Sequence, residues 1–312
     1  MATTRETRFA YGDALLEVGK AHPEVVVLDA DLYKSTRTVV FREAFPERFI
    51  DIGIAEMDMV STAAGMAASG LTPYCNSFAM FLTAHVYDQV RIQICYPKLH
   101  VVLAGSSAGL TQGPDGASHQ SLEDVALMRA LPNMTVLVPA EGVETEAATK
   151  AAATLPGPVY LRLGRYPVPD LFDGSYRFEL GKARVLREGS DMALVACGHM
   201  VNAALQAAEL LAGRGIAAEV VNMATIKPLD TAFVADLATR VPLVVAVEEH
   251  SIIGGLGSAV AEVMAECGGR ARLVRLGTRD VFGESATADE LLAKHGLTGP
   301  QIAERLQAER AG

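Results

Sequence analysis

The sequence has no excess of positive charge, and this absence excludes several classes of partner. Its 27 Lys and Arg residues face 37 Asp and Glu residues, so the net charge is -10 and the pI is near 5.2. Nucleic acids and anionic membrane surfaces attract proteins with a basic face. We therefore expect neither a nucleic acid nor a membrane surface as a partner.

Long apolar runs are also absent. No stretch approaches the roughly 20 residues that cross a bilayer, and residues 1–8 lack the apolar core of a signal peptide. The four cysteines form no Cys-x-x-Cys pair, and three of them sit in or beside apolar runs. We expect buried free thiols and a cytoplasmic protein.

Common ligand-binding signatures are missing as well. The sequence contains no Gly-x-x-x-x-Gly-Lys-[Ser/Thr] phosphate loop and no His-x-x-x-His pair. Residues 248–250 (Glu-Glu-His) offer three ligating side chains, but one strand end brings them together poorly. We expect no metal ion held by this chain.

What is present is enough apolar sequence for two domains. The 312 residues (33.0 kDa) are 50% hydrophobic and 21% charged, so disorder is not expected. Continuous apolar runs alternate with helical patterns, which indicates parallel sheets covered on both faces. A polar turn cluster at 170–176 follows Pro167 and Pro169 and is typical of a linker. The expected fold is α/β: two three-layer α/β/α domains with mostly parallel sheets, at 1–168 and 189–312, with a linker at 169–188.

The apolar runs and helical patterns also give approximate element positions. Strands are expected near 25–28, 50–53, 73–76, 100–104, 134–138, 159–163, 192–197, 218–221, 243–247 and 272–276. Helices are expected near 56–69, 80–95, 122–129, 141–153 and 201–214, and one starting after Gly257.

Residues 51–59 (Asp-Ile-Gly-Ile-Ala-Glu-Met-Asp-Met) are the most informative segment. They read as a strand running into a helix, with Glu56 at the junction and Phe78 and Phe81 some two dozen residues later. A carboxylate beside an aromatic shelf suits proton exchange with a flat heterocycle. Taken singly, Glu56 also fits favourable charge at a helix start, and the two phenylalanines fit core packing on one helical face.

A second candidate is a glycine-rich loop, defined here as residues 105–120. It carries four glycines and places Asp115, His119 and Gln120 close together. Long loops of this kind on a compact sheet are more often functional than not. His119 alone fits a structural role equally well, because histidines also satisfy loop backbone groups.

The order in which these motifs occur along the chain resembles that of a known enzyme family. Further segments accompany them on both sides: Thr7–Leu15, Asp29–Ser35, Leu131–Val136, Leu161–Arg165 and Glu248–Gly257. Together they resemble the transketolase family of thiamine-diphosphate enzymes over nearly the whole chain. The resemblance covers the pyrimidine-binding domain (1–168) and the transketolase C-terminal domain (189–312) only.

The resemblance implies roles for individual residues. Glu56 would bond the aminopyrimidine of thiamine diphosphate, Phe78 and Phe81 would pack on that ring, and Asp31 would lie at the cofactor edge. Glu56 and His119 would be the catalytic residues of a ketol transfer from a ketose to an aldose.

The same resemblance assigns the sugar contacts. His119 and Asp115 would hydrogen-bond the donor sugar, and Arg8, Ser35 and Arg165 would grip its phosphate. Two positions depart from the family pattern: Ser107 stands where many members have His, and Pro114 stands where split relatives have Glu. These departures put the usual pentose-phosphate substrates in question and leave open a ketose with a modified end.

The part of the family that binds the cofactor diphosphate is missing. Its Gly-Asp-Gly…Asn motif, which holds Mg²⁺, does not occur here. The chain thus resembles the carboxy-terminal subunit of a split transketolase. The resemblance implies a separate amino-terminal subunit that supplies Mg²⁺ and the diphosphate site, in an α2β2 assembly where the C-terminal domain contributes packing. The alternatives are the β subunit of a 2-oxoacid dehydrogenase, a 1-deoxyxylulose-5-phosphate synthase, and a non-catalytic assembly or regulatory subunit.

Overall fold

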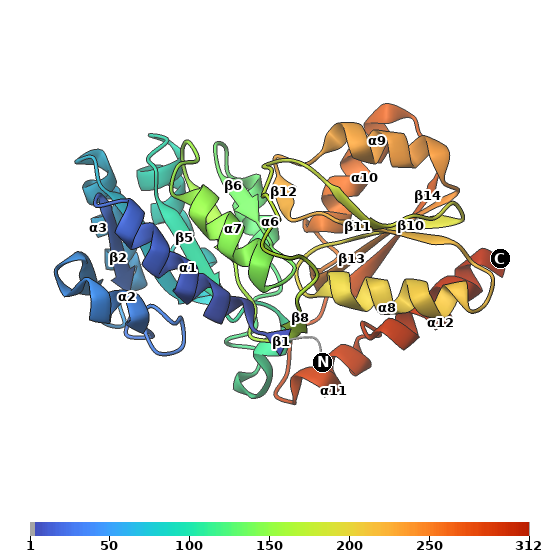
Figure 1. Ribbon diagram of the computed structural model, residues 1–312, viewed down its shortest axis with the longest axis horizontal. Coiled ribbons are helices and arrows are strands. Elements are labelled where there is room, and N and C mark those ends of the chain that lie inside the picture. The colour runs from blue at the N-terminus through green and yellow to red at the C-terminus, as the bar shows by residue number, and fades with distance from the viewer. Residues whose placement is uncertain (1–3, 312) are drawn as a thin grey trace.

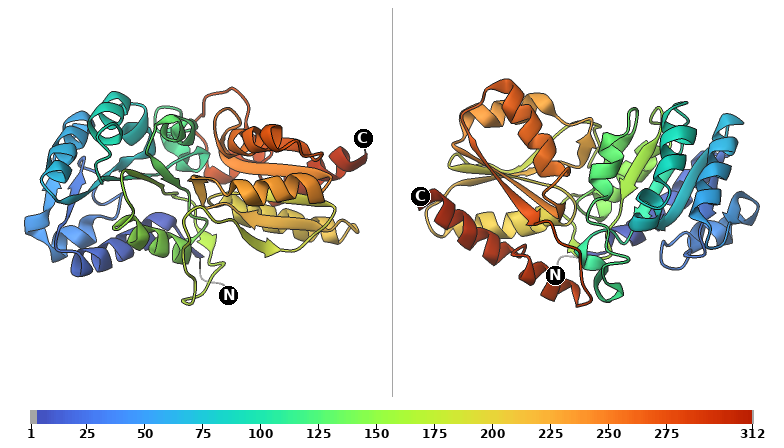
Figure 2. Two further views of the ribbon diagram at one scale, coloured as in Figure 1. Left: turned by 90° about the horizontal axis from the view of Figure 1, so that it is seen from above. Right: turned by 180° about the vertical axis from the view of Figure 1, so that it is seen from behind.

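The computed structural model describes residues 4–311, so the first three residues of the segment screened for a signal peptide lie outside it. The chain forms two α/β units side by side, each built on a mostly parallel sheet (Figure 1). Helices lie on both faces of each sheet in all three ribbon views (Figures 1 and 2). The predicted fold class is confirmed.

The first sheet has seven strands in the order β12-β6-β7-β5-β4-β2-β3. Its strands are β2 (Val25–Asp29), β3 (Phe49–Asp51), β4 (Thr72–Phe78), β5 (Val102–Ser106), β6 (Thr135–Leu137), β7 (Val159–Arg162) and β12 (Thr225–Lys227). Every pairing is parallel except that of β12 with β6. Because β12 comes from the second half of the chain, the two units share this sheet.

Both faces of the first sheet are covered, and alternation along β2 shows how. Val25 and Val27 pack with one set of helices, whereas Val26 and Leu28 pack with the other. The first set is α1 (Thr7–Ala21), α2 (Val39–Ala44) and α7 (Gly142–Ala152). The second set includes α3 (Glu56–Ala68), α4 (Ala79–Thr83), α5 (Tyr87–Gln89), a π-helical turn (Val90–Cys95) and α6 (Asp124–Ala130). Burial on both faces explains the continuous apolar runs.

The single helix expected near 80–95 is wrong. The chain instead forms α4, α5 and the π-helical turn, because Val86 (φ -119°, ψ 18°) leaves the helical region. Phe78 is also not helical. It ends β4 with an extended backbone (φ -69°, ψ 149°), so Phe78 and Phe81 do not lie on one helical face.

The second sheet has five strands in the order β14-β13-β10-β11-β9. They are β9 (Arg184–Arg187), β10 (Met192–Ala196), β11 (Ala218–Asn222), β13 (Leu243–Ser251) and β14 (Arg272–Thr278), with only β9 antiparallel. The accompanying helices are α8 (Met200–Ala212), α9 (Thr231–Arg240), α10 (Leu256–Cys267), α11 (Ala288–Lys294) and α12 (Gly299–Ala311). Helices α9 and α10 lie on one face, with α8 and α12 on the other (Figure 1).

Short elements complete the chain. Strand β1 (Thr4–Arg5) pairs with β8 (Val168–Pro169), which ties the start of the described chain to the end of the first unit. Two 3₁₀ turns, Pro46–Arg48 and Leu110–Asp115, lie before β3 and within the glycine-rich loop. From β8 to β9 the described chain forms no helix or strand, and this segment falls within the predicted linker.

Candidate active site

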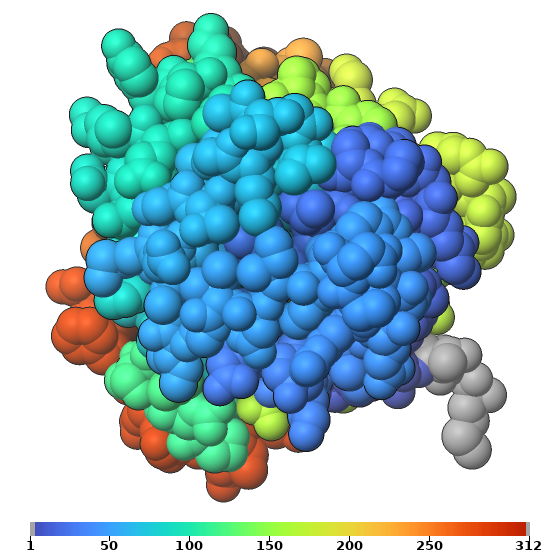
Figure 3. Space-filling view, turned by 90° about the vertical axis from the view of Figure 1, so that its left-hand side faces the viewer, coloured from blue at the N-terminus to red at the C-terminus, as the bar shows by residue number. Residues whose placement is uncertain are grey.

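The predicted site residues gather at one edge of the first sheet. Strands β2, β4 and β5 are adjacent and parallel, so their carboxyl ends meet there. Ligands of open α/β sheets bind at this kind of edge. Figure 3 shows the first unit from the side on which α2 and α3 lie in Figure 1, and segments of the first hundred residues (blue to cyan) form much of that side.

Glu56 begins α3 and is almost fully buried, at 5% exposed. Its Oε1 accepts a 3.0 Å hydrogen bond from the Ser77 hydroxyl on β4. The first turn of a helix favours negative charge. Its neighbours in the sequence, Ile54 and Met57, are exposed at 84% and 45%. The structure therefore places a buried, hydrogen-bonded carboxylate at the start of α3.

Phe78, Phe81 and His119 form one ring cluster. The two phenylalanine centroids lie 6.3 Å apart at an interplanar angle of 23°. The His119 ring meets both edge-on, 6.0 Å from Phe78 and 5.3 Å from Phe81. The hydroxyl of Ser118 lies 2.9 Å from Nδ1 of His119. The glycine-rich loop thus places His119 against the rings of Phe78 and Phe81. The sequence motifs alone did not reveal this contact.

Six buried side-chain atoms in or beside the glycine-rich loop have no hydrogen-bond partner among the described residues. They belong to Ser106, Ser107, Thr111, Gln112, Gln120 and Ser121. Leaving such a group unpaired costs about 1–3 kcal/mol, and a cluster of them is unusual in a segment with only a structural role. Water or a bound polar ligand could supply the missing hydrogen-bond partners of these atoms, which belong to the same loop as Asp115 and His119 or directly follow it.

Asp115 and Arg165 approach each other across the site. Their closest charged atoms, Oδ2 and a guanidinium nitrogen, are 3.6 Å apart, and both side chains are nearly half exposed. Gln112 Nε2 donates a 2.5 Å hydrogen bond to the same Asp115 oxygen. The Arg165 guanidinium keeps donors free for an anion, since this weak contact leaves most of its N–H groups unused.

Arg8 and Ser35 also come together. The Arg8 guanidinium donates a 3.1 Å hydrogen bond to the Ser35 carbonyl and pairs at 2.5 Å with Glu6. The Thr7 hydroxyl accepts a 2.7 Å hydrogen bond from the Gly164 amide. The segments that carry Arg8 and Arg165 are therefore neighbours, although they are far apart in the sequence.

Asp29 organises the segment that carries Asp31 and Ser35. Its buried carboxylate accepts hydrogen bonds from the Leu32 amide (2.6 Å) and from the Thr36 and Thr38 hydroxyls (2.7 and 2.8 Å). Burial raises the pKa of Asp29 to about 6, although these hydrogen bonds oppose the shift. Asp31 follows with a left-handed backbone (φ 59°). Sequence reasoning missed this role of Asp29, and the signal that could have found it is its position directly after the apolar run 25–28.

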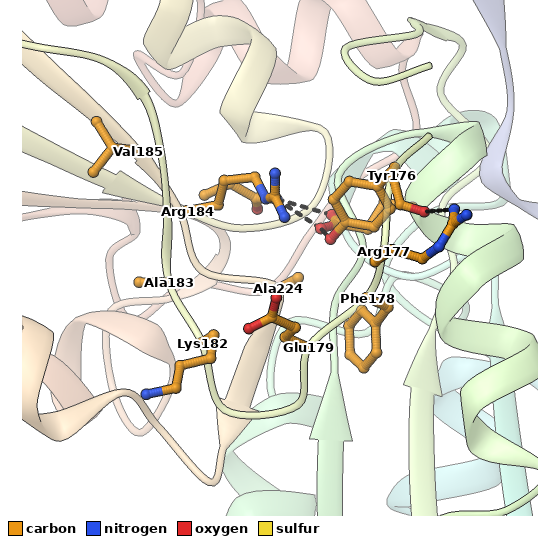
Figure 4. Close-up of a pocket in the computed structure, with 11 residues that line it drawn as sticks. Tyr176, Arg177, Phe178, Glu179, Lys182, Ala183, Arg184, Val185 and Ala224 are labelled. Atoms are coloured by element: carbon orange, nitrogen blue, oxygen red, sulfur yellow. Dashed lines mark hydrogen bonds between the residues drawn. The ribbon is translucent and has the colours of Figure 1, made fainter. Parts of the chain in front are cut away.

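A separate hollow of about 290 Å³ lies between the linker and the second sheet (Figure 4). It contains none of the predicted site residues. Glu144 accepts hydrogen bonds there from Tyr176 (2.5 Å) and Asn222 (2.8 Å), and Arg184 lies over the Tyr176 ring at 4.8 Å. These contacts hold the linker between the two units.

Two further features concern ions and membranes. In residues 4–311 no group of three or more His, Cys, Asp or Glu side chains is arranged to hold a metal ion. Over the same residues, every helix is too short or too polar to cross a bilayer.

Comparison with known families decides the assignment. Residues 3–169 match the family model of the transketolase pyrimidine binding domain, and residues 181–302 match that of the transketolase C-terminal domain. The chain belongs to the transketolase family.

Individual relatives agree with this membership. A transketolase C-terminal section from Methanocaldococcus jannaschii is 45% identical over 304 residues, covering 97% of this chain and 95% of the relative. A subunit of a 6-deoxy-6-sulfo-D-fructose transketolase from Clostridium sp. is 44% identical, covering 95% of this chain and 91% of the relative.

Solved structures give the same picture. A split-gene transketolase in an inactive β4 tetramer has a TM-score of 0.89 and 47% identity, and the match covers 98% of each chain. Transketolase from Campylobacter jejuni has the same fold, with a TM-score of 0.84 at 23% identity, and this chain matches 47% of it. The predicted resemblance to the carboxy-terminal subunit of a split transketolase is confirmed.

Proposed function

We propose that this chain transfers a two-carbon ketol unit from a ketose to an aldose, using thiamine diphosphate, together with a separate amino-terminal subunit. The observation that carries the proposal is the joint placement of Glu56, the Phe78–Phe81 shelf and His119 at one sheet edge. Family membership supports the cofactor, because the pyrimidine-binding domain is one of the two matched domains.

The residues present fit the pyrimidine end of the cofactor. Glu56 is buried and accepts its hydrogen bond from Ser77, so its carboxylate keeps lone pairs for a ring N–H. Phe78 and Phe81 offer ring faces for a flat heterocycle. Bound thiamine diphosphate would supply the nucleophilic carbon that accepts the ketol unit. Glu56 would hold the proton at the pyrimidine nitrogen, while the phenylalanines exclude water.

The remaining site residues would bind the donor sugar. His119 and Asp115 would hydrogen-bond its oxygens, and Asp31 would lie at the cofactor edge. Arg165, Arg8 and Ser35 would receive an anionic end, for which a guanidinium fork is well suited.

The class of donor follows from this anion site and from a relative. We propose a ketose whose terminal group is a phosphate or a sulfonate, because the relative from Clostridium sp. is a subunit of a sulfofructose transketolase. Ser107 stands where many members of the family have His, and the loss of that imidazole supports a donor that differs from the usual ones.

The partner would complete the half-site. Five large apolar side chains of the described first unit are exposed: Ile54 (84%), Met57 (45%), Leu71 (36%), Ile92 (46%) and Tyr96 (82%). Exposed apolar side chains are candidates for a surface that a partner covers. We propose that an amino-terminal subunit brings Mg²⁺ and the diphosphate site in an α2β2 complex.

The cysteines bear on the cellular setting. Cys75, Cys95 and Cys197 are buried free thiols and Cys267 is an exposed free thiol, which supports a reducing, cytoplasmic setting.

Reconstitution tests the proposal. This chain is mixed with the amino-terminal chain that carries Gly-Asp-Gly…Asn, thiamine diphosphate and Mg²⁺, and is assayed with ketoses ending in phosphate, sulfonate or hydroxyl. Ketol transfer from an anionic donor is expected, together with tight cofactor binding by the complex and weak binding by the lone chain. Decarboxylation of a 2-oxoacid without ketol transfer would show a dehydrogenase-type subunit. Inactivity in every assay would favour an assembly role.

A further inference from the structure

We propose that Glu249, in the C-terminal unit, is a positioning residue that sets donor binding by holding the glycine-rich loop in place. This inference rests on the proposed function and gives the C-terminal unit a role beyond packing. Glu249 lies on β13 and is 3% exposed. Its Oε1 accepts a hydrogen bond from the backbone amide of Thr111 in the loop.

Gly109 makes this contact possible. Its backbone is left-handed (φ 84°), and a Cβ atom there would lie 2.3 Å from the Glu249 carboxylate. A side chain at this position would therefore push the carboxylate away from the loop. The loop backbone and Glu249 fit each other only with glycine here.

The C-terminal unit also holds the far end of the loop. Gln120 Nε2 donates 2.9 Å hydrogen bonds to the carbonyls of Gly113 and Glu284. Glu284 precedes α11, which packs against the 3₁₀ turn of the loop. Both ends of the segment that carries Asp115 are thus fixed by the second unit.

Arg165, which would bind the anionic end of the donor, is also linked to Glu249. Tyr166, next to Arg165, donates a 2.7 Å hydrogen bond to Asp289, and its ring lies 5.4 Å from that of His199. Nδ1 of His199 lies 3.3 Å from Oε2 of Glu249. Burial lowers the pKa of His199, so the ring is neutral near pH 7. Glu249 therefore holds the loop segment that carries Asp115 through its hydrogen bond to Thr111. It also lies beside His199, which contacts Tyr166, the residue that follows Arg165.

Donor kinetics of the reconstituted complex test this role. In Glu249→Ala the Thr111 amide loses its acceptor, and the donor KM should rise about tenfold or more while kcat changes less. Glu249→Gln keeps an oxygen that can accept the same hydrogen bond, so it should restore most of the affinity. Tyr166→Phe, a milder change, should raise the donor KM by roughly threefold through loss of the single hydrogen bond to the Asp289 carboxylate.

Glu219 provides the matched control. It is a fully buried glutamate on β11 of the same sheet, and it pairs at 2.8 Å with Arg240. Glu219→Ala should lower stability without changing the donor KM. An equal rise in KM in Glu219→Ala would show that general destabilisation is responsible, and the inference would fail.

Hydrogen exchange of the lone chain gives a readout that does not need activity. Amides of residues 109–116 should exchange faster in Glu249→Ala than in wild type, with Glu249→Gln close to wild type. Unchanged exchange in Glu249→Ala would overturn the inference. A wild-type complex without ketol transfer would count against the proposed function, while the exchange result would still decide whether Glu249 positions the loop.

Discussion

The hydroxyl of Ser77 donates a 3.0 Å hydrogen bond to Oε1 of Glu56, and this contact joins the end of β4 to the first turn of α3. Both residues are buried, Ser77 fully and Glu56 with 5% of its surface exposed. The carboxylate is therefore held in one orientation at the sheet edge. A preorganised carboxylate next to an aromatic shelf is what proton exchange with a bound heterocycle requires.

Glu56→Gln should abolish most of the ketol transfer of the reconstituted complex. The amide keeps the size of the side chain but cannot share a proton with a ring nitrogen, so a loss of about 10²–10⁴-fold in kcat is expected. Folding should be intact by circular dichroism. Asp58→Asn, an exposed change in the same helical turn, is the control and should retain activity. Unchanged turnover in Glu56→Gln would remove this residue from the mechanism.

Phe81→Ala should weaken binding of thiamine diphosphate to the complex. Loss of the ring contact removes about 1 kcal/mol beyond burial, which corresponds to at least a roughly fivefold rise in Kd. Calorimetric titration of the complex measures this. Phe172→Ala removes a ring that stacks on Tyr176 in the linker, 4.3 Å away, and should leave the cofactor Kd unchanged.

Asp29→Asn should flatten the dependence of stability on pH. The folded-state pKa of Asp29 is raised from 3.8 to about 6, so the folded chain binds the proton more tightly than the unfolded chain. Its contribution to stability is then full below about pH 4 and is lost as the pH rises through 6, a change of about 2–3 kcal/mol. Asparagine has no such titration.

Denaturant unfolding at several pH values between 4 and 7 measures this effect. The free energy of unfolding of wild type should fall more steeply over this interval than that of Asp29→Asn. Asp58→Asn should keep the wild-type slope. Equal slopes for wild type and Asp29→Asn would contradict the assignment of the raised pKa to Asp29.

Gly109→Ala and Gly70→Ala form a matched pair for stability. Both glycines have positive φ (84° and 92°), but a Cβ at Gly70 meets nothing within 4 Å, whereas one at Gly109 meets the Glu249 carboxylate. Gly70→Ala should cost only the backbone strain of about 1 kcal/mol, and Gly109→Ala should cost clearly more. Thermal unfolding of the two variants compares them, and equal losses would show that the loop accommodates a side chain.

Local patterns predicted the central strands of both sheets and helices α3, α6, α7, α8 and α10, but they missed α1, α2, α9, α11 and α12 and the break after α4. The helix expected at 56–69 is α3, and the strand expected at 25–28 is β2. The helix expected at 80–95 failed although its apolar residues Leu82, Val86, Val90 and Ile94 are all buried in one core. Val86 lies in the turn between α4 and α5, whereas Leu82 lies in α4, and Val90 and Ile94 lie in the π-helical turn. Burial gives the same apolar pattern whether or not the backbone is continuous, so periodicity could not reveal the break.

The sequence by itself determined the family, the two α/β units and the set of residues proposed for the site, because ordered motifs and apolar runs are local properties of the chain. Only the tertiary structure decided how those residues are held. Ser77 meets Glu56 across 21 residues, Glu249 meets Thr111 across 138 and Gln120 meets Glu284 across 164. Strand β12, from the second half, completes the first sheet. Such contacts depend on strand register and on the packing of two units. Strands that are apolar on both faces carry no alternating pattern from which the register could be read, and the packing of the units joins residues far apart in the sequence.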